Sequence, residues 1–503
     1  MKRNARLLAL VLAALMLIGV FASCSEKPED EEKGDYVGVG EWDGTRENTP
    51  DLLPDDLDFD GAVISVLHRE GLQENECEGE MGEADIVHQA VFERNLRVEA
   101  RLNIDFNWVP TKSGGLQETK NEIVTELSAF TDDYDFILTT NNTILSSGMN
   151  AYLWDFNSAM YIDLTQPWWW ISCMDEMSFD GVTYNFLVGE MNLTNFHKMS
   201  AFYFNTELVE QFLQMTPGDM YDMVDEGKWT LDQLHLMVSK CYFDKNGNTM
   251  ADVGDIFGMP IAGTETITQL AFSTKFDVYK RFPNGRVEIL LNNNRMISVV
   301  EKLTKLMHQN KGVYIQNSVN GSTGFDGFVI TDFTEGKYVF MAQRFTAVCS
   351  EDMRQMETDY GIIPYPTLEE GDEYVSYIQS SSTCMSVPYA VDQDRFDRVC
   401  AVLEALSAEA YRSVTEKFYE LALKSKYVRD DYDSPRMIDI IYNTSTKYFI
   451  DEYNSEAGGI FGIVADSIIN QKSVTTAYAS KGEAAQNAIN HFIMECIAAW
   501  RGQ

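Results

Sequence analysis

Between residues 58 and 140, hydrophobic residues recur at the spacing of strands in some segments and at the spacing of helices in others. Residues 62–67 and 104–109 are short runs rich in β-branched and aromatic residues, which predict strands. Residues 85–101 and 117–130 carry apolar residues between charges at helical spacing, which predicts helices. A third strand is predicted over residues 134–139. The order β-α-β-α-β predicts an α/β fold, in which helices cover a parallel sheet.

Two asparagines, Asn141 and Asn142, follow the third predicted strand. Ligands of parallel α/β sheets bind beyond the carboxyl ends of the strands. We therefore expect Asn141 and Asn142 to lie near a cleft, where their amides can hydrogen-bond the hydroxyl groups of a ligand.

A second set of elements follows residue 200. Phe202 to Asn205 predicts a strand that leads into a helix at Thr206, and Trp229 to Asp232 predicts a helix start with Thr230 as its N-cap. Further strands are expected after the turn at Gly336 and over residues 360–366, and helices over residues 392–426 and 482–500. A chain of 503 residues with 45% hydrophobic residues is long enough for two to three domains.

The amino terminus has the pattern of a secretory signal. Lys2, Arg3 and Arg6 precede a short apolar run over residues 7–20, which ends in small residues before Cys24. This arrangement resembles a bacterial lipoprotein signal, although Phe21 replaces the usual leucine. The resemblance implies cleavage after residue 23 and a lipid on Cys24. An ordinary cleaved signal with an incidental cysteine is the alternative.

Residues 24–57 are acidic, contain proline and glycine, and lack apolar periodicity. Such a segment cannot bury enough apolar surface to offset the entropy of ordering, so it predicts a flexible, lipid-anchored linker. No later segment offers about 20 uninterrupted apolar residues. The mature chain is therefore expected to be anchored to the extracytoplasmic face of the cell membrane.

The net charge and the spacing of the cysteines argue against some classes of partner and of site. The formal net charge is −39, so the phosphate backbone of a nucleic acid would be repelled. Seven cysteines remain besides Cys24, at wide spacings and without a CxxC pair. A clustered zinc or redox site is therefore disfavoured, and most of these cysteines are expected to be buried as small hydrophobic residues, with any disulfide pairing left open.

Several blocks along residues 60–500 together resemble an extracellular solute-binding protein of a bacterial ABC importer, in the family that includes maltose-binding protein. The blocks are ADIVHQAVFERNLRVEARLNI, YDFILTT, IDLTQPWWW with DGVTYNF, SAFYFNTELVEQF, EGKWTLDQL, FTEGKYVFM and YGIIPYPTLEEGDEYVSYIQSSSTCMSVP. The resemblance implies a two-lobed fold, with an N-terminal lobe of residues 58–188 and 376–425 and a C-terminal lobe of residues 189–375 and 426–503. The lobes would be joined by crossing segments near residues 184–200 and 374–388.

The same resemblance implies a function. Such proteins close on a solute between their lobes, deliver it to a membrane permease, and perform no chemistry. We expect a monomer whose solute is a sugar, and a neutral one. A peptide or another small solute is the alternative within this fold; a secreted glycan-active enzyme and a surface adhesin are alternatives of other classes.

Aromatic residues are the first candidates for ligand contact, because flat rings match the apolar faces of sugars. They are Trp154, Trp168, Trp169, Trp170 and Tyr203. Three consecutive tryptophans cannot all face one way, so at least one of them is expected to be structural. The resemblance adds Arg344 and Phe345 as ligand-facing residues, with a role in lobe packing as the alternative.

A possible calcium loop runs from Asp244 to Asp255. Oxygen-bearing side chains fall at positions 1, 3, 5, 9 and 12, and the carbonyl of position 7 faces the same centre in such loops. These positions are Asp244, Asn246, Asn248, Asp252 and Asp255, with Met250 supplying the carbonyl. The loop resembles an EF-hand or dockerin loop, but it lacks the glycine at position 6 and the glutamate at position 12. A polar turn between two elements is the alternative.

The sequence contains no motif that supports a catalytic function. The sequence has no HExxH, GxSxG, P-loop or GxGxxG motif. Carboxylates are spread throughout an acidic chain, so pairs of them carry no weight as a glycosidase signal. We therefore expect a binding protein without an organic cofactor.

Overall fold

The computed structural model describes residues 43–71, 76–79, 81, 85–146, 148–276, 278–316, 327–424 and 433–501. The predicted signal over residues 1–23, the lipidated Cys24 and the linker up to residue 42 lie outside these described residues. Within the described ranges, none of the helices combines the length and the apolar character needed to cross a membrane.

The first sheet contains the three strands predicted near the amino terminus. Its order is β14-β3-β1-β2, and β1 (Ala62–His68) pairs in parallel with both β2 (Ile104–Pro110) and β3 (Phe136–Thr140). The last strand, β14 (Thr383–Ser386), comes from far along the chain and pairs antiparallel with β3. The predicted β-α-β-α-β order is therefore confirmed.

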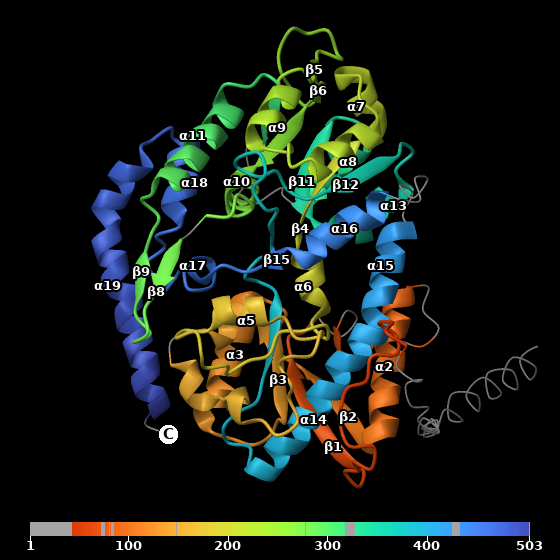
Figure 1. The fold of residues 1–503 in the computed structure, drawn as a ribbon, viewed down its shortest axis with the longest axis vertical. Coiled ribbons are helices and arrows are strands. Elements are labelled where there is room, and N and C mark those ends of the chain that lie inside the picture. Colours follow the sequence, from red (N-terminus) through yellow and green to blue (C-terminus); the bar gives the residue numbers. More distant parts are fainter. Residues whose placement is uncertain are drawn as a thin grey trace, which may run out of the picture. The chain divides into compact units, whose positions relative to one another are not determined.

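Helices α2 (Ile86–Leu102) and α3 (Leu116–Ala129) connect these strands and lie on opposite sides of the sheet in Figure 1. Asp85 caps α2 by accepting hydrogen bonds from the backbone N–H groups of Val87 and His88. Asn103 ends the helix in the left-handed conformation, which asparagine tolerates well.

A second sheet has the order β11-β4-β12, with both neighbours antiparallel to the central strand. Its strands are β4 (Ser200–Asn205), β11 (Phe340–Arg344) and β12 (Tyr360–Ile363). The predicted N-cap of the helix after Trp229 is confirmed, because the Thr230 hydroxyl accepts a hydrogen bond from the N–H of Gln233 in α9 (Leu231–Val238).

The remaining elements surround these two sheets. The strands are β5 (Tyr242–Phe243), β6 (Ile256–Phe257), β7 (Met259–Ala262), β8 (Tyr279–Arg281), β9 (Val287–Ile289), β10 (Val313–Gln316), β13 (Ser376–Tyr377) and β15 (Ser445–Thr446). The helices before residue 393 are α4 (Asn141–Ile144), η2 (Met149–Tyr152), η3 (Phe156–Ser158), α5 (Ile171–Met177), α6 (Leu193–Lys198), α7 (Thr206–Leu213), α8 (Pro217–Asp225), α10 (Gly263–Phe272), α11 (Asn294–His308), α12 (Gly327–Thr334), η5 (Phe345–Cys349) and α13 (Glu351–Gln355). The later helices are α14 (Gln393–Glu409), the π-helical turn η6 (Ala410–Val414), α15 (Thr415–Lys424), α16 (Asp433–Asn443), α17 (Phe449–Glu452), α18 (Gly462–Ile469) and α19 (Val474–Arg501).

Two crossing segments join the regions around the sheets. Leu187 pairs with Met385 and Met199 pairs with Ile378, both antiparallel, so residues 187–199 and 378–385 run side by side. The hinge of crossing segments expected from the sequence is therefore present. The residue limits of the two lobes stay a prediction.

The C-terminal helix α19 contacts elements of both regions. Its partners include α11 and α18 on one side and the short helix η2, which follows β3 and α4, on the other. The side-chain amide of Asn150 in η2 donates a hydrogen bond of 2.9 Å to the carbonyl oxygen of Cys496 in α19. Both Asn150 and Cys496 are buried.

Residues 43–57 differ from the flexible linker predicted for them. Asp51 and Leu53 are buried, and the Asp51 carboxylate forms ion pairs with Arg101 of α2 and Arg412 of η6. Composition indicated a tether because the segment has few apolar residues, but two basic side chains of the folded part hold it instead. The packed part of the chain therefore begins before residue 57.

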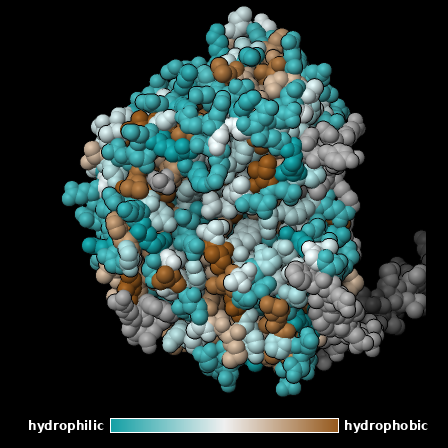
Figure 2. All heavy atoms as spheres, in the orientation of Figure 1, coloured by the Kyte–Doolittle hydropathy of each residue, from teal (hydrophilic) through white to brown (hydrophobic). Residues whose placement is uncertain are grey.

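The described cysteines are all free: six are buried and Cys349 is half-buried. The face drawn in Figure 2 is largely hydrophilic, and its hydrophobic residues form small separate groups. That face therefore lacks the broad apolar surface that obligate subunit interfaces bury.

Candidate ligand-binding site

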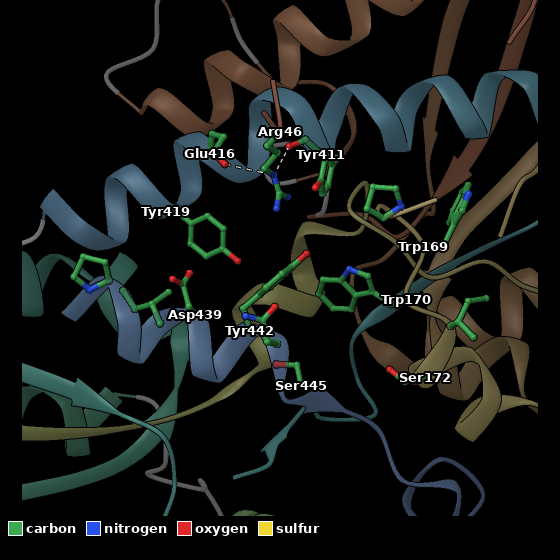
Figure 3. A pocket seen from close by; sticks show the side chains of 15 residues that line it. Arg46, Trp169, Trp170, Ser172, Tyr411, Glu416, Tyr419, Asp439, Tyr442 and Ser445 are labelled. Atoms are coloured by element: carbon green, nitrogen blue, oxygen red, sulfur yellow. Dashed lines mark hydrogen bonds and ion pairs between the residues drawn. The ribbon is translucent and has the colours of Figure 1, made fainter. Parts of the chain in front are cut away.

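A pocket of about 760 Å³ lies between helices α15 and α16 (Figure 3). Volumes of this size are typical of small-molecule sites. Helix α15 packs against α2 beside the first sheet, whereas α16 packs against α8 and β12 of the second. One wall of the pocket therefore packs mainly beside the first sheet and the other beside the second, although α15 also contacts η5, which follows β11.

Aromatic rings form much of the wall. The aromatic residues that line it are Trp169, Trp170, Tyr411, Tyr419 and Tyr442. Trp170 meets Tyr442 edge to face, with ring centroids 6.0 Å apart, and Tyr442 stands edge-on to Tyr419 at 5.7 Å. These contacts fix the rings, so that they offer rigid surfaces to a ligand at low entropic cost.

Glu190 lies beneath the pocket and is completely buried. Its carboxylate accepts hydrogen bonds from the indole N–H of Trp170, at 3.3 Å, and from the hydroxyl groups of Thr415 and Tyr442. Because Thr415 belongs to α15 and Tyr442 to α16, one carboxylate connects both walls of the pocket.

Arg46 pairs with this carboxylate from the amino-terminal segment. One guanidinium nitrogen of Arg46 lies 2.8 Å from Glu190, and another donates to the carbonyl oxygen of Tyr411 at 2.7 Å. The guanidinium carbon lies 3.7 Å from the centre of the Tyr411 ring, a cation–π contact. Burial alone would lower the pKa of Arg46, but Glu190 and Tyr442 outweigh that effect and raise it.

The three consecutive tryptophans have different environments. Trp168 is completely buried and does not line the pocket, as expected for at least one of the three. Trp169 borders the pocket, and its indole N–H donates a hydrogen bond of 2.9 Å to Glu404. Trp170 is half-buried and faces the pocket (Figure 3). Burial raises the pKa of Glu404 to about 8.

Trp154 lies away from this pocket. Its ring stacks on Phe396 with centroids 4.4 Å apart, and its indole N–H donates to the carbonyl oxygen of Val391. The sequence made Trp154 a candidate for ligand contact because it is aromatic, but helix α14 covers the ring instead. Trp154 therefore has a packing role in the structure.

The two asparagines after β3 have opposite environments. Asn142 is exposed, whereas Asn141 is completely buried and donates to Glu452 at 3.3 Å. Glu452 faces the buried ammonium group of Lys447, which also contacts Ser382. Burial raises the pKa of Glu452 to about 7. Neither asparagine lines the pocket of Figure 3.

Tyr203, Arg344 and Phe345 are buried in and beside the second sheet. The Tyr203 hydroxyl donates to the carbonyl oxygen of Arg344, and the Arg344 guanidinium donates to Gln379 at 2.7 Å. None of the three lines the pocket. All three were candidates for ligand contact, Tyr203 as an aromatic residue and Arg344 and Phe345 by resemblance, but they pack between β4, β11 and a crossing segment.

Sequence reasoning missed most of the pocket. Arg46, Glu190, Tyr411, Tyr419 and Tyr442 carry no local motif, since each contacts residues more than a hundred positions away. The one available signal was the spacing of aromatic residues on the tail helices, which equally fits a core-facing stripe.

The loop from Asp244 to Asp255 forms a network of short-range hydrogen bonds. The Asp244 carboxylate accepts from the backbone N–H groups of Gly247 and Thr249, and the Asn248 amide donates to Asp252. In the part of the chain that the structure describes, no three His, Cys, Asp or Glu side chains form a metal-binding group. The side-chain oxygens of Asp244, Asn248 and Asp255 thus accept hydrogen bonds from backbone N–H groups within one turn-rich loop.

No family model matches the sequence, and neither does any curated protein. Solved structures do match it. UgpB from Mycobacterium tuberculosis, in complex with glycerophosphocholine, is 12% identical with a TM-score of 0.55, and the match covers 86% of this chain and 100% of that one. The GacH receptor of Streptomyces glaucescens, solved unliganded and with acarbose, is 12% identical with a TM-score of 0.54 and coverage of 85% and 98%.

The ABC substrate-binding protein Lmo0181 from Listeria monocytogenes, in complex with cycloalternan, is 10% identical with a TM-score of 0.52 and coverage of 86% and 99%. The chain has the two-lobed fold of ABC-importer solute-binding proteins. The fold expected from the sequence is thereby confirmed. At identities of this size the likeness concerns the fold, so what the chain binds is argued below.

Proposed function

We propose that this protein is the lipid-anchored solute-binding component of an ABC importer and that it captures a carbohydrate between two lobes. The observation that carries the proposal is the pocket between α15 and α16. Helix α15 packs against α2 beside the first sheet, and α16 packs against β12 of the second. Solute-binding proteins of this fold in complex with acarbose and cycloalternan support the class of ligand.

The pocket chemistry suits a sugar. The rings of Trp170, Tyr419 and Tyr442 offer apolar faces to C–H groups, while Ser172, Ser445 and Asn443 supply polar partners for hydroxyl groups. Pockets that combine aromatic walls with a few polar groups orient small ligands well.

Capture is proposed to work by closure. A solute that touches α15 and α16 together binds more tightly when the two walls are near, so it shifts the population toward the closed state. The crossing segments allow the walls to approach, and the closed surface is what a membrane permease would recognise. No chemical step on the solute is proposed.

Cys24 is proposed to carry the lipid after removal of residues 1–23, which would hold the domain on the extracytoplasmic face of the membrane. The acidic composition argues against a nucleic-acid partner, and we propose that the protein acts as a monomer. A small peptide is the second candidate for the pocket, because carboxylates and tyrosines also suit amine and amide groups.

The experiment is a thermal-shift screen of the purified mature protein against mono- and oligosaccharides and short peptides, followed by calorimetry on the hits. A sugar that raises the melting temperature and binds with a one-to-one stoichiometry is expected. If peptides stabilise the protein and no sugar does, the carbohydrate assignment fails although the fold stands.

We also propose that the loop from Asp244 to Asp255 binds Ca²⁺ with the modest affinity of extracellular modules, on the order of 10⁻⁴–10⁻³ M. The support is the spacing of Asp244, Asn246, Asn248, Asp252 and Asp255 on one continuous turn, with the Met250 carbonyl at position 7. The ion would brace the loop next to β5 and β6 and take no part in solute binding.

A further inference from the structure

The acidic and basic side chains of the pocket do not balance. Of the described residues that line it, Arg46 alone is positively charged, and Glu416 and Asp439 are negatively charged. The completely buried Glu190 adds a third carboxylate below. Arg46 is already paired with Glu190 at 2.8 Å and with Glu416 at 3.4 Å.

Asp439 has no such partner. It projects from α16 at the pocket wall, near Tyr419 and Tyr442 in Figure 3. No hydrogen bond or ion pair of its carboxylate is found among the described residues. A basic neighbour on the same helix, Arg436, pairs with Asp225 of α8 instead. The charge of Asp439 is therefore available to a ligand.

Tyr419 provides a second unsatisfied group. Its hydroxyl oxygen is buried and makes no hydrogen bond to the residues that the structure describes. Burial raises the pKa of Tyr419 well above its usual value, so the hydroxyl stays neutral and can accept or donate. A buried hydroxyl without a partner is costly unless something supplies one. In Figure 3 this oxygen points toward the middle of the pocket.

The aromatic walls already hold one cation. The guanidinium of Arg46 lies 3.7 Å from the ring centre of Tyr411 and 5.9 Å from that of Tyr442, beside the Glu190 carboxylate. Ring faces next to carboxylates are the surroundings in which proteins bind ammonium groups. The ring faces near Asp439 repeat this combination, and no cationic side chain of the described residues is recorded over them.

We infer that the solute carries a protonated amine and that Asp439 is its counter-ion, which makes an amino sugar the ligand class. The inference rests on the proposed function and narrows it, since a neutral sugar would leave Asp439 unpaired. Tyr419 would accept a hydrogen bond from the same amine or donate one to a neighbouring hydroxyl group.

The test uses matched sugar pairs that differ by one amine in place of one hydroxyl: glucosamine and glucose, galactosamine and galactose, and mannosamine and mannose. Calorimetry is done at about pH 6, where an amine of this type is protonated. We expect the amine of at least one pair to bind about tenfold more tightly than its hydroxyl partner.

Asp439→Asn should remove this preference and leave the affinity for the hydroxyl sugar within about twofold. Asp394→Asn is the matched control, because Asp394 is an exposed aspartate on α14 outside the pocket and its loss changes the net charge equally. Melting curves of both variants verify folding. The inference is overturned if Asp439→Asn still binds the amino sugar more tightly than the hydroxyl sugar. It is also overturned if Asp394→Asn loses this preference to the same extent.

The outcomes separate the two proposals. If the hydroxyl sugars bind as tightly as the amines, the amine inference is wrong and the carbohydrate function stands. If no sugar of either kind binds the folded wild-type protein, the carbohydrate function fails and the inference fails with it.

Discussion

Trp168, Trp169 and Trp170 are consecutive, yet each has a different environment. Trp168 is completely buried, Trp169 donates its indole N–H to Glu404, and Trp170 lies edge-on to Tyr442 at the pocket. A ring held at the pocket wall by neighbouring rings keeps its face available to a ligand. The contribution of each tryptophan can therefore be separated by single substitutions.

Replacing Trp170 by Ala should weaken sugar binding by roughly tenfold, because one aromatic stack on a sugar lies near the low end of about 1–3 kcal/mol. Isothermal calorimetry with a sugar found in the screen measures the change. Trp154→Ala is the control, since Trp154 stacks on Phe396 away from the pocket. An equal loss in both folded variants would show that Trp170 has no direct role.

Glu404 predicts a pH dependence of stability. Its pKa is raised to about 8 by burial, so the folded state keeps a proton that the unfolded state releases near pH 4.5. Stability from this group is fully present below about pH 4.5 and is lost as the pH rises toward 8.

Glu404→Gln keeps the acceptor for Trp169 without the charge. The melting temperature of this variant, relative to that of the wild type, should therefore rise between about pH 5 and pH 8 and level off above pH 8. Differential scanning calorimetry across this range gives the comparison. A constant difference between the two proteins would show that the Glu404 carboxyl does not titrate in that window.

At the scale of elements, the pocket depends on helices that are distant in sequence. Helix α15 carries Tyr419, α16 carries Tyr442, and the amino-terminal segment adds Arg46. Glu190 ties all three together through hydrogen bonds and an ion pair. Removal of one partner from such a buried charged network is strongly destabilising, so these elements are expected to order together.

The loop between β5 and β6 is a separate element with its own prediction. Millimolar Ca²⁺ should raise the melting temperature of the wild-type protein, because an ion that binds the folded loop stabilises the folded state. Asp244→Ala should abolish the rise, and Mg²⁺ at equal concentration serves as the control for ionic strength. A wild-type protein that does not respond to Ca²⁺ would leave the loop as a polar turn.

Sequence patterns predicted local elements well and the pocket poorly. The strands at residues 62–68, 104–110 and 136–140 matched because runs of β-branched and aromatic residues are local signals. Arg46 was assigned to a tether, since its acidic surroundings hide that Glu190, 144 residues away, binds it. Arg344 and Phe345 were placed at the ligand by resemblance, but sheet packing buries them.

At the scale of the whole molecule, two crossing segments and α19 are among the described connections between the regions around the two sheets. The crossing segments pair at Leu187 with Met385 and at Met199 with Ile378. Helix α19 lies beside α11 and α18 (Figure 1). It also contacts η2, where Asn150 bonds to Cys496. Motion between the regions must strain or release the contact between α19 and η2.

Small-angle X-ray scattering should detect whether the contact between α19 and η2 restrains the opening of the molecule. The ligand-free Asn150→Ala variant is expected to have a larger radius of gyration than the ligand-free wild type, because a buried hydrogen bond between η2 and α19 is lost. Addition of the sugar should bring both proteins to the same smaller value. Asn157→Ala, which changes an exposed asparagine of η3, is the control. Equal radii without ligand would show that α19 does not restrain opening.

Helix α19 also bears on which molecules can enter. A helix is stiff along its axis, so a strut attached on both sides limits how wide the gap between α15 and α16 can become during each opening event. Compact solutes pass a narrow gap easily, whereas long or branched chains need a rarer, wider excursion. We therefore expect α19 to limit the rate of entry by solute size: in stopped-flow measurements short oligosaccharides should associate faster than long ones, even where their final affinities are alike.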